Sequence, residues 1–308
     1  MTAWLVGARA VHIGACLLLF GIFAFDHFVL TALRRETGRD EHRRICVVNL
    51  TLLPVILLSG VVWLLLVAMN MSGEPLHSDI VKTVWLQTEF GAAWRVRLIL
   101  WLAAVLGAAG FYLAKQHRAT QTFLLWLQLI LSGALLGSLA YAGHGLGDSH
   151  WHLYADVLHL LIAGIWPTGL LPFLLRFNGT RRRLDQAGAE DSAKLVRRFS
   201  AISLGSVAVL TLTGLVNSWF LVGSVTNLLS QPYGRWLLLK LLLFVLAVAI
   251  GAVNLLHLKP RLTRAGFSDQ DLGATTAQLS VNVRVELLLG SAVIVVVAIL
   301  GVLPPAMH

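Results

Sequence analysis

Eight long apolar stretches divide this chain of 308 residues, and only short polar segments lie between them. As an α-helix, each stretch is long enough to cross a hydrocarbon core of about 30 Å. The composition, with 57% hydrophobic and 13% charged residues, excludes a water-soluble globule of this length. The sequence therefore predicts an all-α, polytopic membrane protein, with one transmembrane domain over residues 1–308. The predicted spans are Trp4–Leu33, Ile45–Met71, Arg95–Ala114, Thr122–Ala142, His152–Leu175, Phe199–Gly223, Trp236–Leu256 and Val285–Leu303.

Basic residues are concentrated in the segments that follow the odd-numbered spans. These residues are Arg34, Arg35, Arg39, Arg43, Arg44, Lys115, Arg118, Arg176, Arg181, Arg182, Arg183, Lys194, Arg197, Arg198, Lys259, Arg261, Arg264 and Arg284. The opposite side has only Lys82 and Arg235 in its loops. Because segments kept in the cytoplasm hold an excess of Lys and Arg, both termini are predicted to face outward. In a bacterial inner membrane the outward side is the periplasm. The net charge of +9 thus indicates topology and does not indicate nucleic-acid binding.

The chain contains an internal repeat, with halves at about residues 4–145 and 151–303. Arg9 and His12 open the first span much as Asp156 and His159 open the fifth. Four spans per half, an even number, mean that both copies cross the membrane in the same direction. We therefore expect two parallel four-helix repeats. Further matched positions are Ser59-Gly60 with Thr213-Gly214, Phe90-Gly91 with Tyr233-Gly234, and Arg97 with Lys240.

A histidine-rich segment runs directly into the fifth span. Spacings of i, i+4 and i+7 place His152, Asp156 and His159 on one helical face. Imidazole and carboxylate groups that converge there suit a borderline or soft transition metal. In the repeat, His12 and His159 lie roughly 10–12 Å below the outer ends of their helices and are expected to face each other. The predicted metal ligands are His12, His144, His150, His152, Asp156 and His159.

Several polar residues admit more than one interpretation. Asp156 matches Arg9 in the repeat, so an ion pair between the halves competes with a metal bond. Cys16 lies one turn below His12, where a lone Cys is usually a packing residue. Three further groups have their own expectations. Weaker candidates for metal contacts are Met69, Met71 and His77. The cations Arg95, Arg97 and Lys240 are expected to snorkel or to pair with Glu89 and Asp156. A candidate exit cluster is formed by Asp26, His27 and Cys46.

Over nearly the whole chain the sequence resembles the copper resistance protein D family (CopD, also PcoD). The matching residues are Arg9 and His12, Phe90-Gly91 with Trp94 and Arg95, Gly143-His144, Asp156 and His159 with Trp166 and Gly169-Leu170, Arg198-Phe199-Ser200, Tyr233-Gly234 with Lys240, and Pro304-Pro305. Many relatives have Trp-x-Gly-Gly-Leu in the fifth span. This chain has Pro167 and Thr168 there, and Pro167 is expected to kink that helix.

The resemblance implies an inner-membrane protein that moves copper, as Cu(I) or Cu(II), from the periplasm toward the cytoplasm. It also implies a small periplasmic copper carrier of the CopC type as partner. The sequence contains no G-x-x-x-x-G-K-[ST] segment, so ion movement would be passive or driven by the membrane potential or a proton gradient.

Two other functions stay open at this stage. One is a haem-binding electron carrier or membrane reductase, because paired histidines on neighbouring spans also hold b-type haem. The other is a copper-sensing scaffold that docks the carrier. No hydrolase or transferase constellation is visible, so no enzymatic activity is predicted.

Overall fold

The structure, a computed structural model, describes residues 2–30, 39–73, 75–114, 117–142, 150–181, 186–263 and 269–306. Within these ranges it contains helices and no strands. Eight helical stretches are long and apolar enough to cross a membrane, which confirms the predicted class. They are Thr2–Leu30, Glu41–Ser72, Glu89–Leu113, Ala119–Ala142, His150–Gly179, Glu190–Val222, Pro232–Leu262 and Gly273–Leu300.

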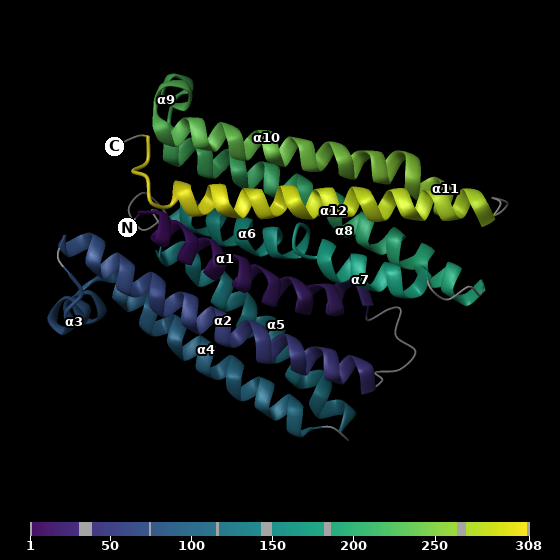
Figure 1. Cartoon of the computed structure of the whole chain (residues 1–308), viewed down its shortest axis with the longest axis horizontal. Coiled ribbons are helices and arrows are strands. Elements are labelled where there is room, and N and C mark those ends of the chain that lie inside the picture. The colour runs from purple at the N-terminus through teal and green to yellow at the C-terminus, as the bar shows by residue number, and fades with distance from the viewer. Residues whose placement is uncertain are drawn as a thin grey trace.

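The helices run side by side along the long axis of the molecule (Figure 1). The N-terminal half contains α1 (Thr2–Phe25), η1 (Asp26–Leu30), α2 (Arg39–Ser72), α3 (Ser78–Gln87), α4 (Glu89–Leu113), α5 (Arg118–Gly137) and η2 (Ser138–Ala142). The C-terminal half contains α6 (His150–Ile165), α7 (Leu170–Arg181), α8 (Gln186–Val222), α9 (Val225–Ser230), α10 (Pro232–Val253), η4 (Asn254–Leu258), α11 (Lys259–Thr263) and α12 (Asp269–Leu300).

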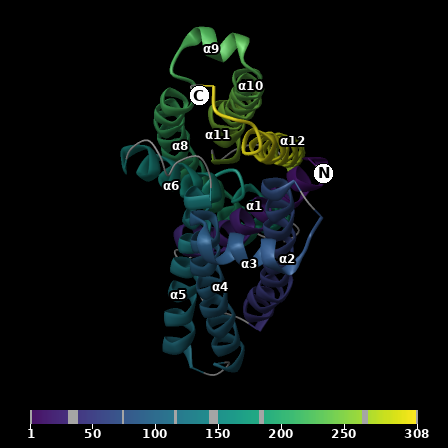
Figure 2. The ribbon, with the colours of Figure 1, turned by 90° about the vertical axis from the view of Figure 1, so that its left-hand side faces the viewer.

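Helices α1 and α6 lie in the middle of the bundle. Seen along the helices, α8, α10 and α12 form a group on one side of them, and α2, α4 and α5 form a group on the other (Figure 2). In the most apolar part of the first span 72% of residues are buried, against 6% in the span Pro232–Leu262. The first span is therefore a central element, and the apolar surface of α10 is directed largely outward, as lipid contact requires.

The two central helices approach each other closely because glycines face the contact. A Cβ at Gly21 would collide with the carbonyl oxygen of Gly164 and with Thr168 Oγ1, and a Cβ at Gly164 would collide with Phe20. Thr168 Oγ1 also donates hydrogen bonds to the carbonyls of Leu17, at 3.2 Å, and Gly164. Small residues and a buried hydroxyl are what membrane helices use to associate where no hydrophobic driving force acts between them.

Pro167 interrupts the fifth span, as predicted. Helix α6 ends at Ile165, residues 166–169 form turns, and α7 begins at Leu170. Pro167 has no N–H to donate to the preceding turn, and the residue before a proline disfavours helical geometry. The helix resumes with hydrogen bonds from Leu171 N to Thr168 O and from Phe173 N to Gly169 O.

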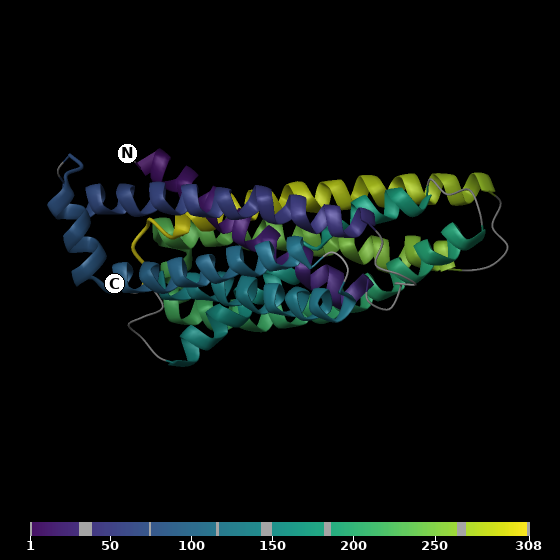
Figure 3. The ribbon, with the colours of Figure 1, turned by 90° about the horizontal axis from the view of Figure 1, so that it is seen from below.

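Both halves use the same device to connect their second and third spans. Gly73 after α2 and Gly223 after α8 have φ values of 71° and 69°, the left-handed region that ends helices. The short helices α3 and α9 follow, at the same end of the molecule as the two termini (Figures 1 and 3). Their backbone carbonyls lie directly against Gly91 of α4 and Gly234 of α10.

These two glycine contacts give a stability prediction. In Gly91→Ala and Gly234→Ala, the new methyl group would overlap backbone carbonyls, so we expect each variant to lose about 1–3 kcal/mol of stability. Gly205→Ala on α8 is the matched control, because nothing lies within 4 Å of its Cβ position. Thermal unfolding of detergent-purified protein measures all three. Equal midpoints for the Gly91, Gly234 and Gly205 variants would contradict the packing described here.

Candidate functional site

His12 is the most enclosed polar side chain in the upper part of α1, with 1% of its surface exposed. Its Nδ1 lies 3.0 Å from the carbonyl oxygen of Ile56 and 3.1 Å from Ser59 Oγ, both on α2. The carbonyl can only accept, so Nδ1 carries the proton. Ser59 Oγ donates its own proton to Val55 O, at 2.6 Å, and is left to accept from the ring. A neutral His12 therefore presents Nε2 as an unprotonated nitrogen.

Arg97 of α4 faces this Nε2. Its Nη2 lies 2.5 Å from His12 Nε2 and 3.6 Å from Cys16 Sγ, and the Cys16 sulfur is 3.8 Å from the same ring nitrogen. The other terminal nitrogen, Nη1, donates to Leu135 O at 2.8 Å and to Ser138 Oγ at 2.6 Å. The guanidinium thus fills the space between an imidazole nitrogen and a thiol, two groups that bind soft metals.

Aromatic rings surround the centre formed by His12, Cys16 and Arg97, called here the His12 centre. The His12 ring lies 5.5 Å from Trp63 and 5.2 Å from Trp94, measured between centroids. A cavity of about 90 Å³ opens beside it. The cavity is lined by His12, Arg97 and apolar side chains, including Ile56, Trp85, Trp94 and Trp101. An apolar cavity next to a charged group strengthens electrostatic interactions, because water does not screen them.

His159 is held in the same way in the other half. Its Nδ1 lies 2.9 Å from Thr213 Oγ1 of α8, and that hydroxyl donates to Val209 O at 2.7 Å. Thr213 is thereby the acceptor and His159 Nδ1 the donor, so Nε2 is again the unprotonated nitrogen. Lys240 of α10 is close enough to act on His159 electrostatically. His159, Thr213 and Lys240 form the His159 centre.

The two histidines do not share one site. Each ring is directed to the second helix of its own half, His12 to α2 and His159 to α8. The contacts of the two rings thus lie within their own halves, and the expectation that they face each other stays a prediction. In the part of the chain that the structure describes, no group of three or more His, Cys, Asp or Glu side chains is arranged to hold a metal.

Three of the remaining predicted ligands, His150, His152 and Asp156, lie in the first turns of α6. His152 is buried and stacks on Phe220 of α8, with 5.0 Å between ring centroids. Asp156 accepts a hydrogen bond from Asn217 Nδ2 at 3.2 Å and interacts electrostatically with Lys240 and His152. His150 is exposed at the start of α6, and His144 lies outside the described residues.

The structure does not pair Asp156 with Arg9, as one interpretation of the sequence proposed; each of these residues has other described contacts. Arg9 lies over the Trp63 ring at 4.6 Å and against Gly301, at the end of α12. No ion pair joins Arg9 to Asp156 among the described contacts of these two residues. The aromatic face offers Arg9 a cation–π contact in place of a carboxylate.

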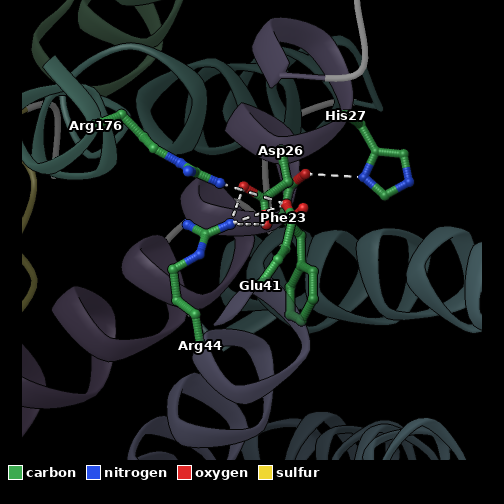
Figure 4. A network of polar contacts seen from close by, with 6 residues as sticks. All are labelled: Phe23, Asp26, His27, Glu41, Arg44 and Arg176. Carbon is green, nitrogen blue, oxygen red and sulfur yellow. Dashed lines mark hydrogen bonds and ion pairs between the residues drawn. The ribbon is translucent and has the colours of Figure 1, made fainter. Parts of the chain in front are cut away.

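An ionic network closes the opposite end of the bundle, where the candidate exit cluster was expected (Figure 4). Arg44 Nη2 lies 2.6 and 2.8 Å from the two carboxylate oxygens of Asp26. Glu41 Oε1 lies 3.6 Å from Arg44 and 3.7 Å from Arg176 of α7, so the network joins the two halves. His27 Nδ1 lies 3.0 Å from Phe23 O. The Asp26 carboxylate thus forms an ion pair with Arg44 through both of its oxygens.

Sequence reasoning did not place Arg97 beside His12. Arg97 was expected to snorkel or to pair with Glu89 or Asp156, yet it is 2% exposed and directed inward. Its interval from Gly91, equal to that of Lys240 from Gly234, was the available signal, because it placed a cation at the same depth in each half. Cys16 was interpreted as a packing residue, but its sulfur borders the site.

Comparison with known proteins agrees with the copper-related features of the sequence. Residues 1–153 match the family model described as copper resistance protein D-like, N-terminal domain, and residues 193–300 match that of copper resistance protein D. No solved structure matches the chain.

Three relatives illustrate the similarity. The chain is 33% identical to copper resistance protein D of Pseudomonas syringae pv. tomato, over 95% of this chain and 94% of that protein. It is 28% identical to copper transport protein CutJ of Bacillus subtilis, over 75% of this chain and 40% of that protein. It is 25% identical to inner membrane protein YebZ of Escherichia coli, over 71% and 70% respectively. With a match of this extent to the first relative, the chain belongs to the copper resistance protein D family.

Proposed function

We propose that this protein carries copper across the bacterial inner membrane, from the periplasm toward the cytoplasm, with His12 and His159 as ligands in two separate centres. The proposal rests mainly on the matched histidine–hydroxyl pairs, His12 with Ser59 and His159 with Thr213. Each pair fixes the tautomer so that Nε2 is the unprotonated nitrogen, which is the form that binds a metal. Family membership supplies copper as the substrate.

The His12 centre suits Cu(I). Nε2 of His12 and Sγ of Cys16 are 3.8 Å apart, so one ion can reach both after small side-chain shifts. Nitrogen and sulfur donors favour a soft ion, and the nearby Trp63 and Trp94 rings make the surroundings apolar. Arg97 occupies this space in the present conformation, and copper would replace it. While no copper is bound, Arg97 donates a hydrogen bond to the lone pair of His12 Nε2.

His144, His150, His152 and Asp156 are proposed to receive copper at the periplasmic end of α6. The exposed position of His150 and the depth of His152 and Asp156 along one helix support an order of handover from surface to His159. A periplasmic carrier of the CopC type is the proposed donor. The proposal further includes two parallel repeats, which the matched contacts of the two histidines support, and both termini in the periplasm, which the distribution of basic residues supports.

The first prediction concerns bound copper. After copper loading and desalting, His12→Ala is expected to lose the ion of its own centre and retain that of the His159 centre, and the reverse holds for His159→Ala. Elemental analysis gives copper per polypeptide for each variant, for the double variant and for His117→Ala, at an exposed histidine directly before α5, as control. Copper content that neither substitution changes would refute the assignment of both centres.

The same preparation discriminates the haem alternative. A Soret band in the purified protein would favour an electron carrier over copper transport. A colourless protein that retains copper would count against haem.

A second prediction concerns Arg97. Arg97→Gln removes a positive charge next to the copper position, so we expect copper affinity at the His12 centre to rise at least tenfold. At an effective dielectric constant of 20, two unit charges about 4 Å apart repel by about 4 kcal/mol, and tenfold in affinity is about 1.4 kcal/mol. Competition with a Cu(I) chelator measures the affinity.

Arg95→Gln is the matched control for this experiment. Arg95 is on the same helix and donates to Trp85 O, and no contact joins it to His12. Unchanged or weaker copper binding in Arg97→Gln, in a variant that unfolds at the wild-type temperature, would mean that Arg97 is structural and does not compete with copper.

A further inference from the structure

Glu286 is an acidic side chain buried in the middle of a membrane span and outside both histidine centres. It is 3% exposed, and it lies thirteen residues after Gly273 and fourteen before Leu300, the ends of the last span. At 1.5 Å per residue, the carboxyl is about 20 Å from either end of the helix. An ionisable residue at this depth is costly, and it marks an ion or proton site more often than a structural one.

Among the residues that the structure describes, no positive charge pairs with this carboxyl. The ionisable side chains described on α12 and on the helices packed against it are Arg9, His12, Cys16, Arg176, Tyr233, Arg235, Lys240, His257, Lys259, Arg261 and Arg284. Among the described residues, none of these forms an ion pair or hydrogen bond with Glu286. Asp26, by contrast, is held by Arg44 at the bundle end. An unpaired carboxylate in a medium of low dielectric constant is strongly disfavoured, and taking up a proton removes the cost.

A chain of side-chain amides connects Glu286 with the surface. Gln278 Nε2 donates to Asn282 Oδ1 at 2.8 Å, and Asn282 Nδ2 donates to Asn254 Oδ1 at 2.6 Å. Asn254 Nδ2 then donates to Glu286 Oε1, also at 2.6 Å. Gln278 is exposed and lies eight residues closer to the α11 end of the bundle than Glu286. The second carboxyl oxygen, Oε2, faces Gly251 of α10.

The local backbone is irregular at the contact with Glu286. Asn254 begins η4, a π-helical segment that follows α10. Such a segment widens the helix by one residue per turn and often marks a functional site. Here it brings the Asn254 amide to the carboxyl.

The first half contains an uncharged counterpart. Gln128 of α5 is fully buried, donates to Ala104 O at 2.8 Å and lies against Gly107 of α4, as Glu286 lies against Gly251 of α10. A neutral side chain of the same size therefore satisfies this packing position. The acid in the second half has a property that packing alone does not require.

We propose that Glu286 is a proton-binding site at the middle of the membrane, which exchanges protons with water that enters from the α11 end of the bundle beside the amides of Asn254, Asn282 and Gln278. A proton from water binds the carboxylate to give the neutral acid, and its release restores the carboxylate. Where the copper transport proposed above holds, this site provides a group through which a proton gradient can act on transport. Proton binding itself does not depend on that proposal.

Infrared spectroscopy of the purified, copper-free protein in lipid nanodiscs tests the site. The carbonyl stretch of a protonated carboxyl is expected to appear in wild type as the pH falls, and the corresponding band to be missing in Glu286→Gln. Asp79→Asn, at an exposed carboxylate of α3, is the control and should retain the band. A spectrum of Glu286→Gln identical to wild type at every pH, or a Glu286 band that does not change with pH, would overturn the proposal.

Two further variants keep the test decisive. If Glu286→Gln does not fold, Glu286→Asp retains the acid, and its band should shift in frequency or in titration midpoint; an unchanged band would overturn the assignment. Asn282→Leu interrupts the amide chain, so the band should remain while its hydrogen–deuterium exchange slows several-fold. Exchange as fast as in wild type would refute the path. Because copper is absent, failure of the transport proposal leaves these results unaffected.

Discussion

A polar side chain inside a hydrocarbon layer has no water to bond with, and this constraint determines the arrangement of both histidine centres. Ser59 and Thr213 each satisfy their hydroxyl hydrogen within their own helix, by donating it to a carbonyl oxygen of the preceding turn. Each hydroxyl oxygen can then accept the imidazole Nδ1–H through its lone pairs. This contact orients both rings, and for His12 the Ile56 carbonyl is a second acceptor.

The same constraint applies to Arg97, the charged side chain beside His12, whose N–H groups also need acceptors within the protein. Arg97 reaches His12 Nε2 together with Leu135 O and Ser138 Oγ, which distributes its charge over three acceptors from α1, α5 and η2. A guanidinium is well suited to this role because its donors are fixed in a plane. Gly60 and Gly214 provide the room, since the His12 and His159 rings lie close to their Cβ positions. The matched Ser59-Gly60 and Thr213-Gly214 pairs therefore act alike. In each pair the hydroxyl accepts a hydrogen bond from the imidazole, and the glycine leaves space for the ring.

The spans could be predicted from the sequence, because length and hydropathy suffice to identify helices that cross a bilayer. The helix break could be predicted too, because Pro167 lacks a donor. The direction in which the His12 side chain points could not be predicted from the sequence. It depends on how α1 is rotated against α2, and a helix that is apolar on all sides has little periodicity from which to infer that rotation. The position of Arg97 also depended on packing, since snorkelling and burial begin from the same residue on the same helix. The matched intervals placed Arg97 and Lys240 at equivalent positions, and the structure shows that Arg97 is directed to His12.

Copper flux tests the account most directly. Purified protein in liposomes, with copper outside and a copper-responsive dye inside, gives the rate of entry for wild type, His12→Ala, His159→Ala and the exposed-site control His117→Ala. The account predicts that the His117 variant matches wild type and that both other variants lose most of the flux while remaining folded. Wild-type flux in the variant that lacks both His12 and His159 would show that copper does not cross through these centres.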